Sequence, residues 1–217
     1  MHTRSERLKR MVLLAMLAAI SYMIVYFVRI PVVLFLKYEP KDVVITIGGF
    51  LFGPMAAFLT SLVVSLLEMV TISETGPIGC IMNLLSTCSF ACTAALIYKK
   101  RHNLKGAVIG LLLGSIVMVA TMLLWNWLIT PWYMNVPREE VQLLLIPMFL
   151  PFNLLKGGLN SALVLVLYKP LVSALRKTGF IPDSPQKARG IKPGVYLFAG
   201  ILLVTCILLM LALQGKL

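Results

Sequence analysis

Residues 151–160 read PFNLLKGGLN and lie inside an apolar run that extends from 143 to 168. A run of this length is typical of a membrane-spanning helix, because a helix rises roughly 1.5 Å per residue and the hydrocarbon core of a bilayer is about 30 Å thick. A lysine at the depth of Lys156 costs roughly 2.5–3.5 kcal/mol on the insertion scale, so we expect it to face a bundle interior or a wet cavity. At helical spacing, Asn153 and Asn160 share its face. For Asn160, an interhelical hydrogen bond that serves packing alone explains the residue equally well.

The rest of the chain has the same character: of its 217 residues, 59% are hydrophobic and 13% are charged. This is far more apolar than a soluble domain, so we predict an all-α integral membrane protein. We predict helices over 9–28, 43–52, 54–72, 78–98, 106–129, 143–168 and 195–213. The basic segment MHTRSERLKR precedes an apolar stretch without a small-residue cleavage site, and we therefore interpret it as a cytoplasmic terminus rather than part of a signal peptide.

Orientation follows from the 20 lysines and arginines, most of which flank the predicted helices on the side of the N-terminus. Basic residues favour cytoplasmic loops, so the N-terminus is predicted to be cytoplasmic. Anionic lipid at that face accounts for the net charge of +12 without a nucleic-acid partner. The four cysteines form no metal-ligand pattern, and we expect neither a metal nor a cofactor.

Other predicted helices contribute polar side chains to the outer half of the bundle, namely Asn126, Asn83 and Glu68. All three tryptophans of the chain lie near the outer end of one helix, together with Tyr133. An interfacial aromatic belt also explains Trp132 and Tyr133. A pocket of apolar and aromatic groups with a few fixed polar ones suits a flat, heteroaromatic small molecule, and we predict such a pocket here.

Sequence motifs for catalysis are missing, including a Walker A sequence, HExxH, GxSxG and clustered aspartates. The chain therefore has no visible energy source of its own. In AMLAA, residues 15–19, the small residues Ala15 and Ala19 lie four apart on one helix face, a spacing that lets another helix approach closely.

Four segments, FLKYEPKDV, GGFLFGP, NWLITPWY and PFNLLKGGLN, occur in this order and resemble the riboflavin-binding S components of energy-coupling factor (ECF) transporters over roughly residues 8–175. The resemblance implies a six-helix S-component bundle with an outward-open vitamin pocket, and a transmembrane T component and two ATPases as partners. It implies hydrogen bonds from Asn126, Asn153 and Lys156 to the polar edge of the isoalloxazine ring. It also implies a gating loop that contains Lys37, Tyr38, Glu39 and Asp42, and contact of Ala15 and Ala19 with the T component.

The chain departs from this family pattern at its C-terminal end. We predict a substrate-binding membrane domain at 1–175, a polar cytoplasmic linker at 176–194 and an additional C-terminal hydrophobic helix at 195–217. The apolar run 195–213 is long enough to span a bilayer. It either occupies a surface that the energising module would use or packs beside the bundle.

The predicted function is capture of riboflavin, as transported ligand, at the plasma membrane of a prokaryote, without catalysis. Alternatives are an S component for another vitamin, for FMN or for a queuosine precursor. A membrane enzyme of lipid or cell-wall metabolism would need paired acids or a nucleophile, for which Glu68 alone is a poor candidate. A purely structural protein would leave Lys156 unexplained. If Lys156 donates to a flavin carbonyl, Lys156→Met should weaken riboflavin binding far more than folding.

Overall fold

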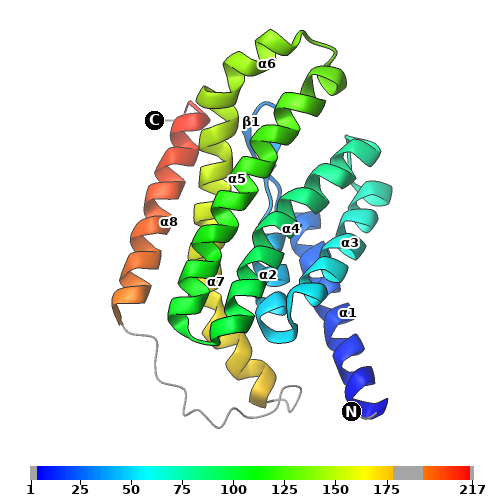
Figure 1. Ribbon diagram of the computed structural model, residues 1–217, viewed down its shortest axis with the longest axis vertical. Helices are drawn as coiled ribbons and strands as arrows, with labels where there is room; N and C mark the ends of the chain where they lie inside the picture. Colours follow the sequence, from blue (N-terminus) through cyan, green and yellow to red (C-terminus); the bar gives the residue numbers. More distant parts are fainter. Residues whose placement is uncertain (1–3, 178–192, 216–217) are drawn as a thin grey trace.

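The computed structural model describes residues 4–177 and 193–215 as a bundle of helices with one short hairpin (Figure 1). The elements in chain order are α1 (Arg4–Phe27), β1 (Ile30–Val33), β2 (Leu36–Tyr38), α2 (Lys41–Phe52), α3 (Pro54–Thr71), α4 (Gly76–Arg101), α5 (Leu104–Met134), α6 (Arg138–Leu144), a π-helical turn (Leu145–Phe149), α7 (Leu150–Lys177) and α8 (Pro193–Leu213). Among the described residues, six helical segments are long and apolar enough to cross a membrane. The predicted helical membrane bundle with an additional C-terminal helix is thereby confirmed.

The short helix α2 lies in the centre of the bundle, where it packs against α1, α3, α4 and α7. Every residue from Lys41 to Phe50 is buried, which means that this helix has no lipid-facing side. It ends in the tight turn predicted from the sequence: Gly53 has a φ of 92°, which favours glycine, and Pro54 occupies the first turn of α3.

Glycines allow α4 and α5 to pack closely. A Cβ atom added at Gly110 would lie 2.7 Å from the carbonyl oxygen of Ala94, and one added at Gly114 would lie 2.6 Å from that of Phe90. Only residues without a side chain allow such an approach. The close packing brings the polar faces of α4 and α5 toward the interior of the bundle.

The sixth predicted helix, 143–168, differs from the structure at both ends. The chain instead forms α6, the π-helical turn and then α7, which continues to Lys177. Pro147 and Pro151 supply no backbone N–H to the regular helical pattern, and a wide turn at this point accommodates them. Helix α7 therefore begins only three residues before Asn153.

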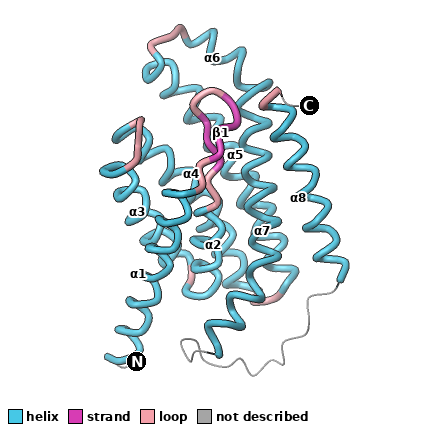
Figure 2. The backbone as a smooth tube through the Cα atoms, turned by 180° about the vertical axis from the view of Figure 1, so that it is seen from behind, coloured by secondary structure: helices cyan, strands magenta, loops and turns pink. Residues whose placement is uncertain are grey.

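The connection between α1 and α2 forms an antiparallel hairpin with Ile30 opposite Tyr38 and Pro31 opposite Lys37. Alternation of side chains along β2 buries Leu36 and Tyr38 and leaves Lys37 half-buried. The hairpin lies at the same end of the bundle as α6 and the C-terminal end of α8, away from the N-terminus (Figure 2).

The additional helix α8 packs against α7 and touches β1. It lies on the opposite side of the bundle from α1 in both views (Figures 1 and 2). The segment therefore packs beside the bundle, on α7. Most of the predicted linker, residues 178–192, lies outside the described residues.

Candidate functional site

A cavity of about 110 Å³ lies beneath the hairpin, between α4, α5 and α7. Five of the residues predicted to act in binding or gating line it, and they come from three elements of the fold: Lys37, Glu39, Asn83, Asn153 and Lys156. The remaining lining residues are Arg29, Phe35, Leu36, Ser73, Glu74, Thr75, Met82, Ser86, Met122, Tyr133 and Phe152. The cavity is thus mixed, with charged groups at one side and aromatic groups at the other.

Lys156 lies on the cavity wall with its ammonium group directed at polar partners. Its Nζ donates to Ser86 Oγ at 3.0 Å and forms an ion pair with Asp42 Oδ2 at 3.2 Å. The lysine side chain is 7% exposed and that of Asp42 is fully buried. An ammonium group has three hydrogens, and the described residues supply partners for two of them. The third is available to a ligand in the cavity.

Asp42, on α2, connects Lys156 with α4 and, through Asn160 of the same helix as Lys156, with the hairpin. Thr87 of α4 donates to its Oδ1 at 2.7 Å, and Asn160 of α7 donates to its Oδ2 at 3.2 Å. Tyr38 of the hairpin in turn donates to Asn160 Oδ1 at 3.1 Å. Burial, with the nearby Asp42 carboxylate as a lesser cause, raises the pKa of Tyr38, so its hydroxyl remains protonated as the donor. Asp42 therefore lies in the first turn of α2, at the centre of a network, rather than in the loop itself.

A second group of buried charges lies next to the first. Lys41 forms ion pairs with Glu39, at 2.8 Å, and with Glu68. Asn83 donates to Glu68 at 2.8 Å, and Arg29 donates to Glu39 at 3.1 Å. Burial raises the pKa of Glu39, but the adjacent Lys41 ammonium and other cations lower it by more, so its net pKa lies below the usual range. Glu68 is thus a partner of Lys41 and does not itself line the cavity.

Asn126 lies in the C-terminal part of α5 and is fully buried. It donates to the carbonyl oxygen of Met122 at 2.7 Å and accepts from Thr130 at 2.9 Å, which leaves one amide hydrogen and one oxygen lone pair unused among the described residues. Unlike Asn153, it lines neither the cavity nor the adjoining pocket. Asn153 donates to the carbonyl oxygen of Phe149 at 2.8 Å while its side chain lines the cavity.

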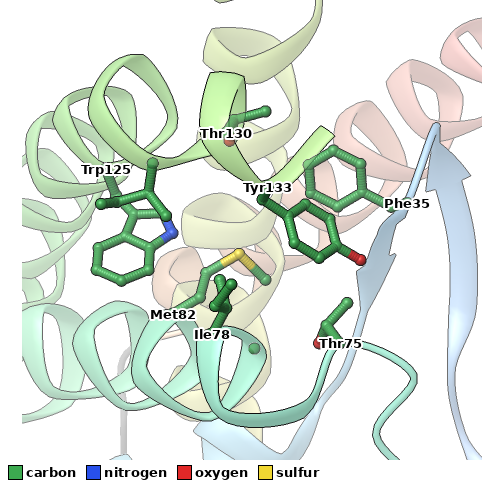
Figure 3. A pocket seen from close by; sticks show the side chains of 9 residues that line it. Phe35, Thr75, Ile78, Met82, Trp125, Thr130 and Tyr133 are labelled. Atoms are coloured by element: carbon green, nitrogen blue, oxygen red, sulfur yellow. The ribbon is translucent and has the colours of Figure 1, made fainter. Parts of the chain in front are cut away.

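Aromatic and apolar side chains surround a small adjoining pocket (Figure 3). Phe35, Met82, Trp125 and Tyr133 point toward the same space from the hairpin, α4 and α5 (Figure 3). Three of them, Phe35, Met82 and Tyr133, also line the larger cavity, so the two spaces are adjacent. Trp132 is 75% exposed, as the aromatic-belt interpretation predicts.

The hairpin and the residue before it are tied to the connection between α3 and α4 by partly exposed groups. Lys37 Nζ lies 2.9 Å from Glu74, and Arg29 donates to the carbonyl oxygen of Ile72 at 2.8 Å. Hydrogen bonding from the Lys37 ammonium lowers the pKa of Glu74. These contacts hold Lys37, one of the predicted gating residues, beside the cavity at the end of the bundle away from the N-terminus.

Three residues of the site, Arg29, Ser86 and Thr87, did not stand out in the sequence. Arg29 follows an apolar run and reads as a helix end, and the hydroxyl side chains are common in membrane helices. Lys41 did not stand out either, because it lies just before the start of a predicted helix, where a lysine is usually exposed, but its side chain is 1% exposed inside the bundle. The signal that identifies it is the length of α2: twelve residues cannot span, so their charged N-terminal end must lie within the protein.

The helix face predicted to contact a partner carries Ala15 and Ala19, both of which are exposed on α1. Larger apolar side chains flank them on the same helix, including Met16 and Ile20. Within the described part of the chain, no group of three or more His, Cys, Asp or Glu side chains is placed to hold a metal ion. The arrangement as a whole is suited to noncovalent binding of a small molecule with one polar and one apolar edge.

Comparisons with known proteins agree with this geometry. Residues 9–168 match the family model described as ECF transporter, substrate-specific component. The riboflavin transporter RibU of Staphylococcus aureus (strain TCH60) is 29% identical over 178 residues, which cover 78% of this chain and 93% of that protein. The riboflavin transporter FmnP of Bacillus subtilis (strain 168) is 26% identical over 186 residues, covering 78% and 97%.

A solved structure, described as the S component of a bacterial ECF transporter, superposes with a TM-score of 0.64 at 29% identity. The superposition covers 99% of that chain and 78% of this one. Helix α8 lies beyond the last residue of the family match.

Proposed function

The chain belongs to the substrate-specific components of ECF transporters, and from this premise we propose that its cavity binds riboflavin for import. Proteins of this family are transport subunits and not enzymes. The observation that carries the proposal is the position of Lys156: a buried ammonium group lines the cavity with one hydrogen still available. A purely structural ion pair would not need a cavity beside it.

The isoalloxazine ring of riboflavin has a polar edge with two carbonyls and an imide N–H, and an apolar dimethylbenzene edge. Lys156, which only donates, suits a carbonyl, while the amide of Asn153 can donate and accept and so suits the imide. The apolar edge would then extend toward Phe35, Trp125 and Tyr133 (Figure 3). One ring orientation satisfies both halves of the cavity.

Riboflavin fits the charges of the cavity better than FMN does. Each cation that lines it has a carboxylate partner: Arg29 pairs with Glu39, Lys37 with Glu74, and Lys156 with Asp42. Two further cations, neither of which lines the cavity, are also engaged, since Lys41 is buried between carboxylates and Arg138 lies over the Trp127 ring at 5.1 Å. A phosphate group would have to compete with these partners, whereas the hydroxyls of a ribityl chain would not.

A spectrum and a titration test the proposal. We expect detergent-purified protein to bind one riboflavin per chain and to quench its fluorescence, with FMN binding at least tenfold more weakly, since an uncompensated charge costs about 1.4 kcal/mol or more. Visible absorption of the purified protein reports any ligand that copurifies. A folded protein that binds no flavin would refute the substrate, and preference for FMN would refute the charge argument.

We further propose that the N-terminus lies in the cytoplasm and that the exposed alanine face of α1 contacts the T component of an ATP-driven module. With this orientation, the hairpin and the cavity face the outside, because they lie at the end of the bundle away from the N-terminus (Figure 1). Helix α8 leaves the α1 face uncovered, on the other side of the bundle.

Substitution of Ala15 tests the partner surface. We expect Ala15→Trp to reduce copurification with the T component and the two ATPases at least tenfold, because a large side chain prevents close approach of the helices. Riboflavin binding should remain unchanged, since Ala15 is remote from the cavity. Leu197→Trp on the lipid-facing side of α8, where Leu197 is 67% exposed, is the matched control. Undiminished copurification of the Ala15 variant would exclude this face.

A further inference from the structure

We propose that α8 is a clamp that positions the β1–β2 hairpin over the cavity and slows exchange of the bound ligand. The hairpin contributes Phe35, Leu36 and Lys37 to the cavity wall, so a ligand beneath it leaves more easily when the hairpin moves. Helix α8 lies outside the part of the chain that matches the family. The proposal rests on the proposed function only for the identity of the ligand.

The first observation is the fit of α8 on α7. Cys206 of α8 is 6% exposed, and a Cβ atom added at Gly158 would lie 2.7 Å from its Sγ. Gly158 belongs to the same motif as Lys156, two residues further along α7. A side chain at Gly158 would push the two helices apart, so the close fit requires glycine at this position. Helix α8 is therefore held in a specific position relative to the site and is not packed loosely against the bundle.

The second observation is the contact of α8 with the hairpin. Gln214, directly after the helix, donates from Nε2 to the carbonyl oxygen of Pro31 at 2.6 Å. Cys206 joins one buried apolar cluster with Val32, Leu36 and Tyr38, and Met210 packs against this cluster. Helix α8 thus contacts β1 directly and shares one apolar cluster with residues of both strands.

The third observation is that the hairpin is held differently on the side that faces the connection between α3 and α4. There the ties run through Lys37 and Glu74, and the glutamate side chain is 75% exposed. An exposed ion pair contributes little, so this tie restrains the hairpin only weakly. Buried polar contacts with the rest of the bundle restrain it as well, from Tyr38 to Asn160 and between Arg29 and Glu39. The contacts with α8 add to them, and they are the ones that lie outside the family match.

The test uses two variants and one control in the full-length protein. Gln214→Leu removes the hydrogen bond to Pro31, and Cys206→Trp displaces α8 from Gly158. Val204→Trp places the same side chain on the lipid-facing surface of α8, where Val204 is 58% exposed. Hydrogen exchange of the amides of residues 30–38 without ligand measures hairpin opening, and stopped-flow fluorescence measures riboflavin association and dissociation.

In Gln214→Leu, we expect amide hydrogen exchange in the hairpin and riboflavin dissociation both to become faster, on the order of fivefold, because one hydrogen bond is lost. In Cys206→Trp, both rates should increase further. Association should accelerate as well, so that affinity changes less than either rate. The control should behave as wild type. If Cys206→Trp fails to fold, Gln214→Leu decides the question by itself.

Unchanged hairpin exchange in Gln214→Leu would overturn the clamp. Faster hairpin exchange with unchanged flavin rates would overturn its role in ligand retention. If the wild-type protein binds no riboflavin, the proposed function fails, while the amide exchange still decides whether α8 restrains the hairpin.

Discussion

Lys156→Met is expected to weaken riboflavin binding about 10- to 100-fold, because a hydrogen bond from a charged donor contributes about 1.5–3 kcal/mol. It is also expected to destabilise the fold. The Asp42 carboxylate, which is fully buried, would lose its cation, and breaking a buried ion pair from one side costs roughly 3–5 kcal/mol. The structure thus revises the expectation from sequence that this variant would weaken riboflavin binding far more than folding.

Binding and folding can be separated with the double variant Asp42→Asn, Lys156→Met. It removes both charges, and the new amide retains an acceptor for Thr87. We expect the double variant to recover most of the lost stability in thermal unfolding but none of the lost affinity in a fluorescence titration. Lys169→Met, the same substitution near the other end of α7, is the control for the loss of a lysine.

Two outcomes would contradict this account. A folded Lys156→Met protein with the affinity of wild type would show that Lys156 does not contact the ligand. A double variant no more stable than the single one would show that the ion pair with Asp42 is not the cause of the destabilisation.

The fold was largely predictable because the membrane imposes a length on every spanning segment. Apolar runs therefore located each long helix, and Gly53-Pro54 located the turn between α2 and α3. The helix ends were less accurate where prolines permit a local irregularity, as at Pro147 and Pro151. The hairpin was not predicted, because its residues are apolar on one side and charged on the other without a turn motif.

The site was predictable in the residues whose depth in the membrane makes a polar group costly. Lys156, Asn153 and Asn83 were identified in this way, and all three line the cavity. Their partners could not be identified, because Asp42 and Lys156 are separated by most of the chain and meet only through the packing of α2 against α7. Sequence alone also cannot show that the Asn126 amide is already engaged within α5.

Lys41→Met is expected to reduce stability more than any other single substitution in the network. It would leave the Glu39 and Glu68 carboxylates buried with only Arg29 beside Glu39 as a cation. A cost of roughly 3–5 kcal/mol for one broken pair is a large part of the 5–15 kcal/mol by which proteins are typically stable, and here two pairs are broken. Thermal unfolding in detergent should show a large decrease in Tm, with loss of folded protein on gel filtration.

The neighbouring hairpin supplies a matched control in Lys37→Met, which breaks an ion pair whose glutamate is 75% exposed and should lower the Tm only slightly. Adding Glu68→Gln to Lys41→Met restores the charge balance and should restore much of the stability. Because Lys41 lies beneath the cavity and does not line it, the rescued variant should still bind riboflavin. If Lys41→Met were as stable as Lys37→Met, the buried charges would not hold the hairpin to the bundle. The two double variants are thus expected to differ. Lys41→Met with Glu68→Gln should regain both stability and riboflavin binding, whereas Asp42→Asn with Lys156→Met should regain stability alone. This difference would distinguish the charges that stabilise the fold from those that bind the ligand.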